Sequence, residues 1–173
     1  MKQRLMWITA ISAVVAIAYA QALTVRGAFG FGYAGAPDAD RPNAQFSFSV
    51  KQAEYNGQSR MRGGFGIEVR EQNRLVAIHM PEVRRLMVDM ENKQAEFSGA
   101  AYAFVRTRQG YQRARGTVVV RVADLRNSRD SEGDPDTITV AFYTDSDSEE
   151  PTYTYQGVVR RGDIVVFERS YSR

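Results

Sequence analysis

The chain has 173 residues, of which 43% are hydrophobic and 25% charged, and this composition is typical of a single globular domain. Its formal net charge is +3, and it contains no cysteine and one histidine. The sequence therefore excludes a disulfide framework, catalysis by a thiol and a zinc site with three histidines.

The first 22 residues have the features of a secretory signal peptide. Lys2 and Arg4 make a positive start, residues 6–18 are uncharged and mostly apolar, and small residues mark two cleavage sites, after Ala20 and after Ala22. An uncleaved membrane anchor is the alternative, but the apolar run is short for a bilayer span. We therefore expect an N-terminal signal helix and a protein that is secreted, periplasmic or located at the cell surface.

The leader carries two of the three net positive charges, so the remaining chain is nearly neutral. A strongly basic balance, which would favour a nucleic acid or an acidic membrane, is therefore lacking. We expect an unknown protein or cell-surface partner, no nucleic acid, and contact with a membrane only through an uncleaved signal segment.

Glycine, alanine, proline and aspartate dominate the stretch that follows the leader. The Gly–aromatic segment 27–35 is either a first edge strand or irregular chain, and Pro37 and Pro42 predict a loop after it. These composition shifts divide the chain into a signal peptide (1–22), a Gly/Pro-rich lead-in (23–43) and a single all-β domain (44–173).

Beyond residue 44 apolar residues alternate with polar ones in one short segment after another, which is the period of half-buried strands. The apolar sets are Phe46/Phe48/Val50, Phe65/Ile67/Val69, Val76/Ile78/Met80, Leu86/Val88/Met90, Ala95/Phe97 with Tyr102/Phe104, Val118/Val120/Val122 and Ile138/Val140/Phe142. Only 83–93 also has helical spacing. Asn56-Gly57 predicts a hairpin turn, and Arg161-Gly162-Asp163 predicts the turn of a final hairpin. The pattern indicates an antiparallel sandwich or partly closed barrel of eight to ten strands.

Charge is distributed unevenly along the chain. Residues 60–121 contain twelve Lys/Arg and six Asp/Glu, whereas residues 122–150 contain two Arg and nine Asp/Glu. Most of these charges alternate with apolar residues along strands, so we interpret them as the solvated face of a sheet.

Four segments carry a resemblance to a known family. They are AQFSFSVK (44–51), LMV with AEFSG (86–88 and 95–99), VVVRVAD with DTITV (118–124 and 136–140) and GVVRRGDIVV (157–166). In the order and spacing of their Gly and Asp residues they resemble the exported bacterial modules called post-COAP domains. The resemblance implies an all-β module of exported proteins and supplies no catalytic residue.

The acidic loops are the one cluster of residues whose side chains could bind a metal ion. The first loop places Asp130, Glu132, Asp134 and Asp136 at every second residue, and a second acidic loop spans 145–150. Calcium binds several carboxylate and carbonyl oxygens at once. Gly133 is in the wrong place for an EF-hand, and solvated turns are the alternative. We retain calcium as a candidate cofactor, bound by these four acids.

Exposed tyrosines are the second candidate site, because aromatic side chains on a sheet face often mark an interface. Tyr143, Tyr153 and Tyr155 are the best candidates for a binding platform, and packing in the core is the alternative.

No catalytic group is evident from the residues. His79 is the only histidine, no G-x-S-x-G nucleophile turn is present, and nothing selects a pair among the carboxylates. We therefore expect a non-catalytic exported module with a structural or interaction role. The alternatives are a small-ligand carrier with a β-barrel cavity and an enzyme that uses paired carboxylates.

Overall fold

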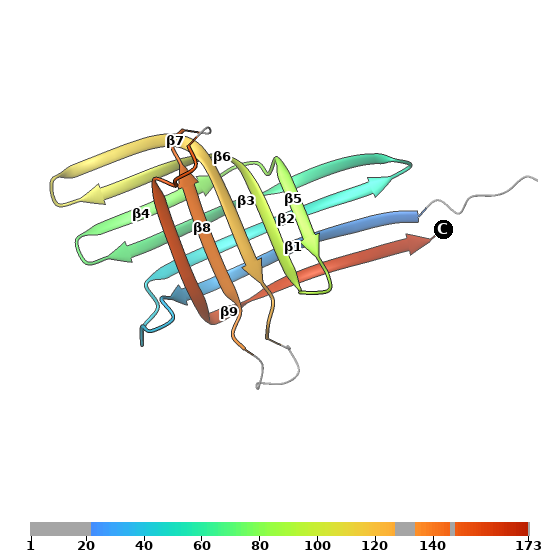
Figure 1. Cartoon of the computed structure of the whole chain (residues 1–173), viewed down its shortest axis with the longest axis horizontal. Helices are drawn as coiled ribbons and strands as arrows, with labels where there is room; N and C mark the ends of the chain where they lie inside the picture. Colours follow the sequence, from blue (N-terminus) through green and yellow to red (C-terminus); the bar gives the residue numbers. More distant parts are fainter. Residues whose placement is uncertain (1–21, 127–133, 146–147, 173) are drawn as a thin grey trace, which may run out of the picture.

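A computed structural model describes residues 22–126, 134–145 and 148–172, and all regular structure in these residues is β-strand (Figure 1). The strands are β1 (Ala22–Gly35), β2 (Ala44–Tyr55), β3 (Gln58–Glu71), β4 (Arg74–Met80), β5 (Arg85–Asp89), β6 (Gln94–Thr107), β7 (Gly110–Ala123), β8 (Thr137–Tyr143) and β9 (Tyr153–Ser172). The all-β antiparallel prediction is confirmed. The expected signal helix lies outside the described residues.

The nine strands form one antiparallel sheet in the order β4-β3-β2-β1-β9-β8-β7-β6-β5. β4 also pairs with β6, so eight strands close into a ring that does not form a barrel, and β5 is attached to the ring at the edge of β6. The closure depends on β6, which pairs with β5 over 94–98 and with β4 over 102–107.

The ring is folded into two layers that face each other across the core (Figure 1). We call the first the wide layer: it consists of β1 to β4, the second half of β9 and the turn half of the β6–β7 hairpin. The second layer consists of β5, β8 and the remaining halves of β6, β7 and β9. The β6–β7 hairpin and β9 therefore pass from one layer to the other, which is how the corners of such packed sheets are made.

Large apolar side chains fill the space between the layers. Phe97 of β6 lies at the centre, with its ring centroid 5.2 Å from that of Phe48 and 6.1 Å from that of Phe65. The alternating apolar sets predicted from the sequence supply most of the buried side chains, including those of β7 and β8. The segment 83–93, with its helical spacing, contains the strand β5.

The lead-in expected over 23–43 is largely a strand in the middle of the sheet. β1 pairs with β2 on one side and with β9 on the other, so it is not an edge strand. Its inward positions are small and its outward ones aromatic, because the ring of Phe48 occupies the space over Gly30: a Cβ at Gly30 would lie 2.7 Å from Phe48 Cε1. Only 36–43 is a loop.

The final hairpin predicted around Arg161-Gly162-Asp163 is wrong, because these residues form a bend within the single strand β9. The register with β1 shifts here: Tyr33 pairs with Arg161 and Ala34 with Val159, which leaves Arg160 as the extra residue of a bulge. Gly162 has φ of 99°, and a Cβ there would collide with the carbonyl oxygen of Phe31. The bend turns β9 from one layer into the other.

Candidate binding face

Side chains that point outward from the wide layer form rows across its strands, because paired residues of antiparallel strands share a face. The first row crosses six strands through Phe31, Ser47, Gly66, His79, Tyr102 and Arg115. The second row crosses the same strands through Tyr33, Gln45, Glu68, Ala77, Phe104 and Arg113. Each row extends about 24 Å, with aromatic rings on β1 and arginines on β7. We call this surface the outer face.

The arginines of β7 lie against aromatic rings of β6. The guanidinium carbon of Arg113 is 4.7 Å from the ring centroid of Tyr102 and 5.4 Å from that of Phe104, and the guanidinium carbon of Arg115 is 5.5 Å from the centroid of Tyr102. A cation–π contact of this kind restrains a guanidinium and leaves N–H groups available to an anion.

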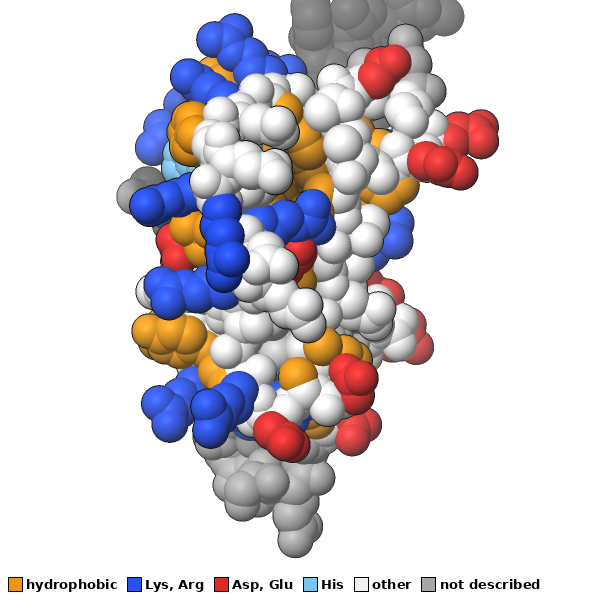
Figure 2. All heavy atoms as spheres, turned by 90° about the vertical axis from the view of Figure 1, so that its left-hand side faces the viewer, with side chains coloured by type: hydrophobic (Ala, Val, Ile, Leu, Met, Phe, Trp, Pro, Cys, Tyr) orange, Lys and Arg blue, Asp and Glu red, His pale blue; other side chains and the backbone are white. Residues whose placement is uncertain are grey.

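Neither of these arginines is neutralised by a carboxylate. Within the described part of the chain, the arginines that form ion pairs with acids are Arg26, Arg70, Arg74 and Arg121. No Asp or Glu occurs between Phe97 and Ala123, a stretch with five arginines. Figure 2 views the end of the molecule that holds the β3–β4 and β6–β7 turns, and shows Lys and Arg gathered along one side with hydrophobic side chains between them.

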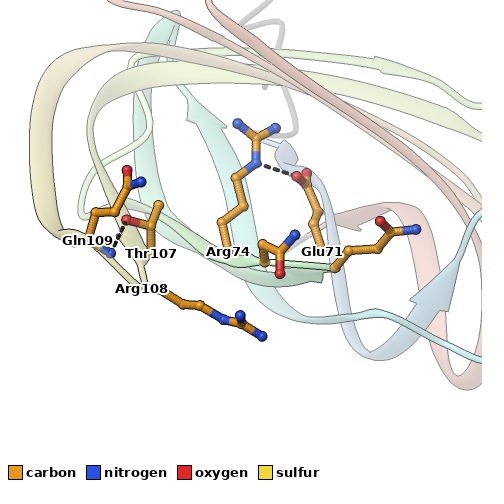
Figure 3. Close-up of a pocket in the computed structure, with 7 residues that line it drawn as sticks. Glu71, Arg74, Thr107, Arg108 and Gln109 are labelled. Atoms are coloured by element: carbon orange, nitrogen blue, oxygen red, sulfur yellow. Dashed lines mark hydrogen bonds and ion pairs between the residues drawn. The ribbon is translucent and has the colours of Figure 1, made fainter.

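A pocket of about 680 Å³ lies between the β3–β4 and β6–β7 turns (Figure 3). In Figure 3 Glu71 and Arg74 point toward each other and form an ion pair. The Tyr153 hydroxyl donates to Glu71 Oε1 at 3.1 Å, and Arg74 lies over the Tyr153 ring. Burial, together with the Glu71 charge, raises the pKa of Tyr153, which keeps the hydroxyl a donor. The acid of this pocket is thus fully engaged, while Arg108 has no described carboxylate partner.

The three tyrosines singled out from the sequence do not share a face. Tyr155 is buried, its hydroxyl donates to Asn43 Oδ1 at 3.2 Å, and burial raises its pKa to about 12. Tyr153 also points inward and packs against the core. Tyr143 alternates with the buried Phe142, so it lies on the opposite side of the sheet.

Of the four acids considered for calcium, Asp130 and Glu132 lie outside the described residues. Asp134 is exposed and Asp136 is fully buried. Both carboxylate oxygens of Asp136 accept backbone N–H groups: Oδ1 from Leu125 at 3.1 Å and Arg126 at 3.0 Å, and Oδ2 from Ile164 at 3.0 Å. No group of three or more acids or histidines able to hold a metal ion occurs in the described ranges.

Asp136 and Asp124 instead accept backbone N–H groups of β9 beyond Val158, where its pairing with β8 stops. Asp124 Oδ2 accepts the N–H of Val166 at 3.0 Å, one pleat beyond the Ile164 N–H bound by Asp136. Asp163 lies close to both: burial first, then the charges of Asp136 and Asp124, raise its pKa, and burial raises that of Asp124. The sequence offered no signal for this role, which depends on the bend of β9.

His79 is exposed on the outer face, in the row between Gly66 and Tyr102. Its side chain has neither a hydrogen bond nor an ion pair with another residue that the structure describes.

Comparisons with family models, with curated proteins and with solved structures give no match to this chain. Among the residues described, no helix is long and apolar enough to cross a membrane. The fold and the outer face therefore define the site on physical grounds: a six-strand surface with stacked, unneutralised arginines at one side and exposed aromatic rings at the other.

Proposed function

We propose that this chain is an exported, non-catalytic binding module whose outer face binds an anionic polymer at the cell surface. The signal-peptide features of the first 22 residues and the resemblance to post-COAP modules support export. The protein then acts through contact with a partner, as expected of an interaction module.

One observation carries the proposal: Arg113 and Arg115 are stacked on Tyr102 and Phe104 without a carboxylate partner. A stacked guanidinium has already lost part of its rotamer freedom, so less entropy is lost when it binds a carboxylate, sulfate or phosphate. Arg106 and Arg108 of the same hairpin add further positive charge.

The alternative of a small-ligand carrier is less well supported. A carrier of that kind needs an enclosed apolar cavity, whereas the centre of this ring holds Phe48, Phe65 and Phe97 in ring-to-ring contact.

The test compares binding of the purified protein to polygalacturonate, polyphosphate and neutral dextran. We expect binding to both anionic polymers at low salt, weakening as salt rises toward about 150 mM, and none to dextran. R113A/R115A should lower affinity for the anionic polymers about tenfold or more, because two charge-assisted contacts are lost.

The matched control is R84A/R85A, which removes the same charge from two exposed arginines at the start of β5, in the second layer and off the outer face, that have no described ring or carboxylate partner. We expect it to leave affinity within about twofold. Equal losses in the two double variants would mean that only total charge matters, and failure of the wild type to bind either anionic polymer would reject the proposal.

A further inference from the structure

A shallow groove of about 730 Å³ crosses the outer face from β1 to β4. One wall is formed by Phe29 and Phe31 of β1, and the other by His79. Its floor consists of small residues of β2 and β3, among them Ser47 and Gly66. The groove is therefore aromatic at one side and polar across its base.

The aromatic wall is unusually exposed. Phe31 has 64% of its surface exposed and contacts no other ring among the described residues. Phe29 precedes it by two residues on the same face, about 7 Å away along the strand, and is steadied by the ring of Phe167 at 6.1 Å. Leaving such side chains in water has a free-energy cost, so a ligand that covers them gains affinity.

The floor is recessed because Gly66 has no side chain. A Cβ at Gly66 would meet only His79 Nδ1, at 3.9 Å, so the space above it is empty. The hydroxyls of Ser47 and Ser49 line the same floor. A pyranose ring matches both features, because it presents an apolar C–H face to an aromatic ring and hydroxyls at its edges.

The groove continues directly into the arginines. His79 of its wall pairs with Tyr102, and Tyr102 pairs with Arg115, so about 10 Å separates the groove from the first stacked guanidinium. A chain of sugars that places one ring in the groove extends along the row to Arg115 and Arg113. The positive charge at that end requires negative charge on the neighbouring sugars.

From this continuity we infer that the polymer bound by the outer face is an acidic polysaccharide, with a pyranose ring held in the Phe31 groove and carboxylates held by Arg113 and Arg115. This inference rests on the proposed function and names its ligand class. An inorganic polyanion would engage the arginines alone, because it has no apolar face for Phe31.

Two variants test the groove without altering its charge. F31T removes the exposed ring and keeps a strand-forming residue. G66V fills the floor, and because its Cβ has room and a β-branched residue suits a strand, the melting temperature should stay equal or rise. Tyr171→Thr is the control: it removes a ring that is 51% exposed near the far end of β9.

We expect F31T to lower affinity for polygalacturonate about five- to tenfold and G66V to lower it at least as much. Both variants should keep polyphosphate affinity within twofold of wild type, and Y171T should change neither affinity. These results, with G66V fully folded, would support the inference.

Other outcomes separate the inference from the proposed function. Equal losses on polygalacturonate and polyphosphate, or no loss on polygalacturonate, would overturn the acidic-polysaccharide inference while anion binding by Arg113 and Arg115 stands. Binding of neutral dextran that depends on Phe31 and not on the arginines would overturn both.

Discussion

Asp136 shows how one buried carboxylate can take the place of a missing strand. It is 0% exposed, and its two oxygens accept three backbone N–H groups from two segments that are distant in sequence. The Ile164 N–H would otherwise be buried without a partner, which is costly, and those of Leu125 and Arg126 are partly buried. The residue therefore secures the corner of β9 and is not free to serve a ligand.

For this residue we predict that D136A destabilises the protein by about 3–5 kcal/mol, because three N–H groups lose their acceptor. D134A, which truncates a neighbouring exposed acid, should change stability by less than about 0.5 kcal/mol. Urea denaturation of the two variants and the wild type measures both values. Similar stability of the two variants would mean that water replaces the Asp136 carboxylate.

Among the elements, β1 and β9 differ most from the sequence-based expectation. Alternation of apolar residues predicted β2, β3, β4, β7 and β8 correctly, because there the large side chain of each pair points inward. In β1 the order is reversed: alanine and glycine point inward and Phe29, Phe31 and Tyr33 outward. Periodicity identifies the two faces of a strand but does not say which one is buried. In β1 the buried face is the one with small residues, because the ring of Phe48 from β2 fills the space over it.

The bend of β9 misled the prediction for a related reason. A glycine flanked by charged residues is common to tight turns and to bulges, and the local sequence does not distinguish them. Here the partner strand β1 continues through the bend and places Gly32 directly opposite Gly162. Only the long-range pairing determines that the chain goes on as one strand.

For this element we predict that G162A costs about 3 kcal/mol, because alanine is strained at this φ and its Cβ collides with β1. G57A is the matched control: Gly57 also has positive φ, but a Cβ there would meet nothing within 4 Å. We expect G57A to cost about 1 kcal/mol. Thermal or urea denaturation gives both values, and equal costs would show that β1 does not constrain the bend.

In the whole molecule, the ring closure through β4 and β6 creates the outer face. Phe31 and Arg115 are 84 positions apart in the sequence, yet they lie in one cross-strand row because β6 extends beyond its pairing with β5 and pairs with β4 over 102–107. The sequence revealed a basic stretch, which we interpreted as the solvated face of a sheet. It did not reveal that Tyr102 and Phe104 hold these arginines, because that contact depends on the β6–β7 register.

The central claim is that the outer face, and not the positive charge of the chain in general, binds an anionic polymer. NMR spectra of the arginine Nε–Hε groups, recorded while the protein is titrated with polygalacturonate, test it most directly. We predict that the signals of Arg113 and Arg115 shift in a saturable way while those of Arg84 and Arg85, which lie in the second layer, stay in place. Shifts of equal size at all four arginines, or none at Arg113 and Arg115, would contradict the account.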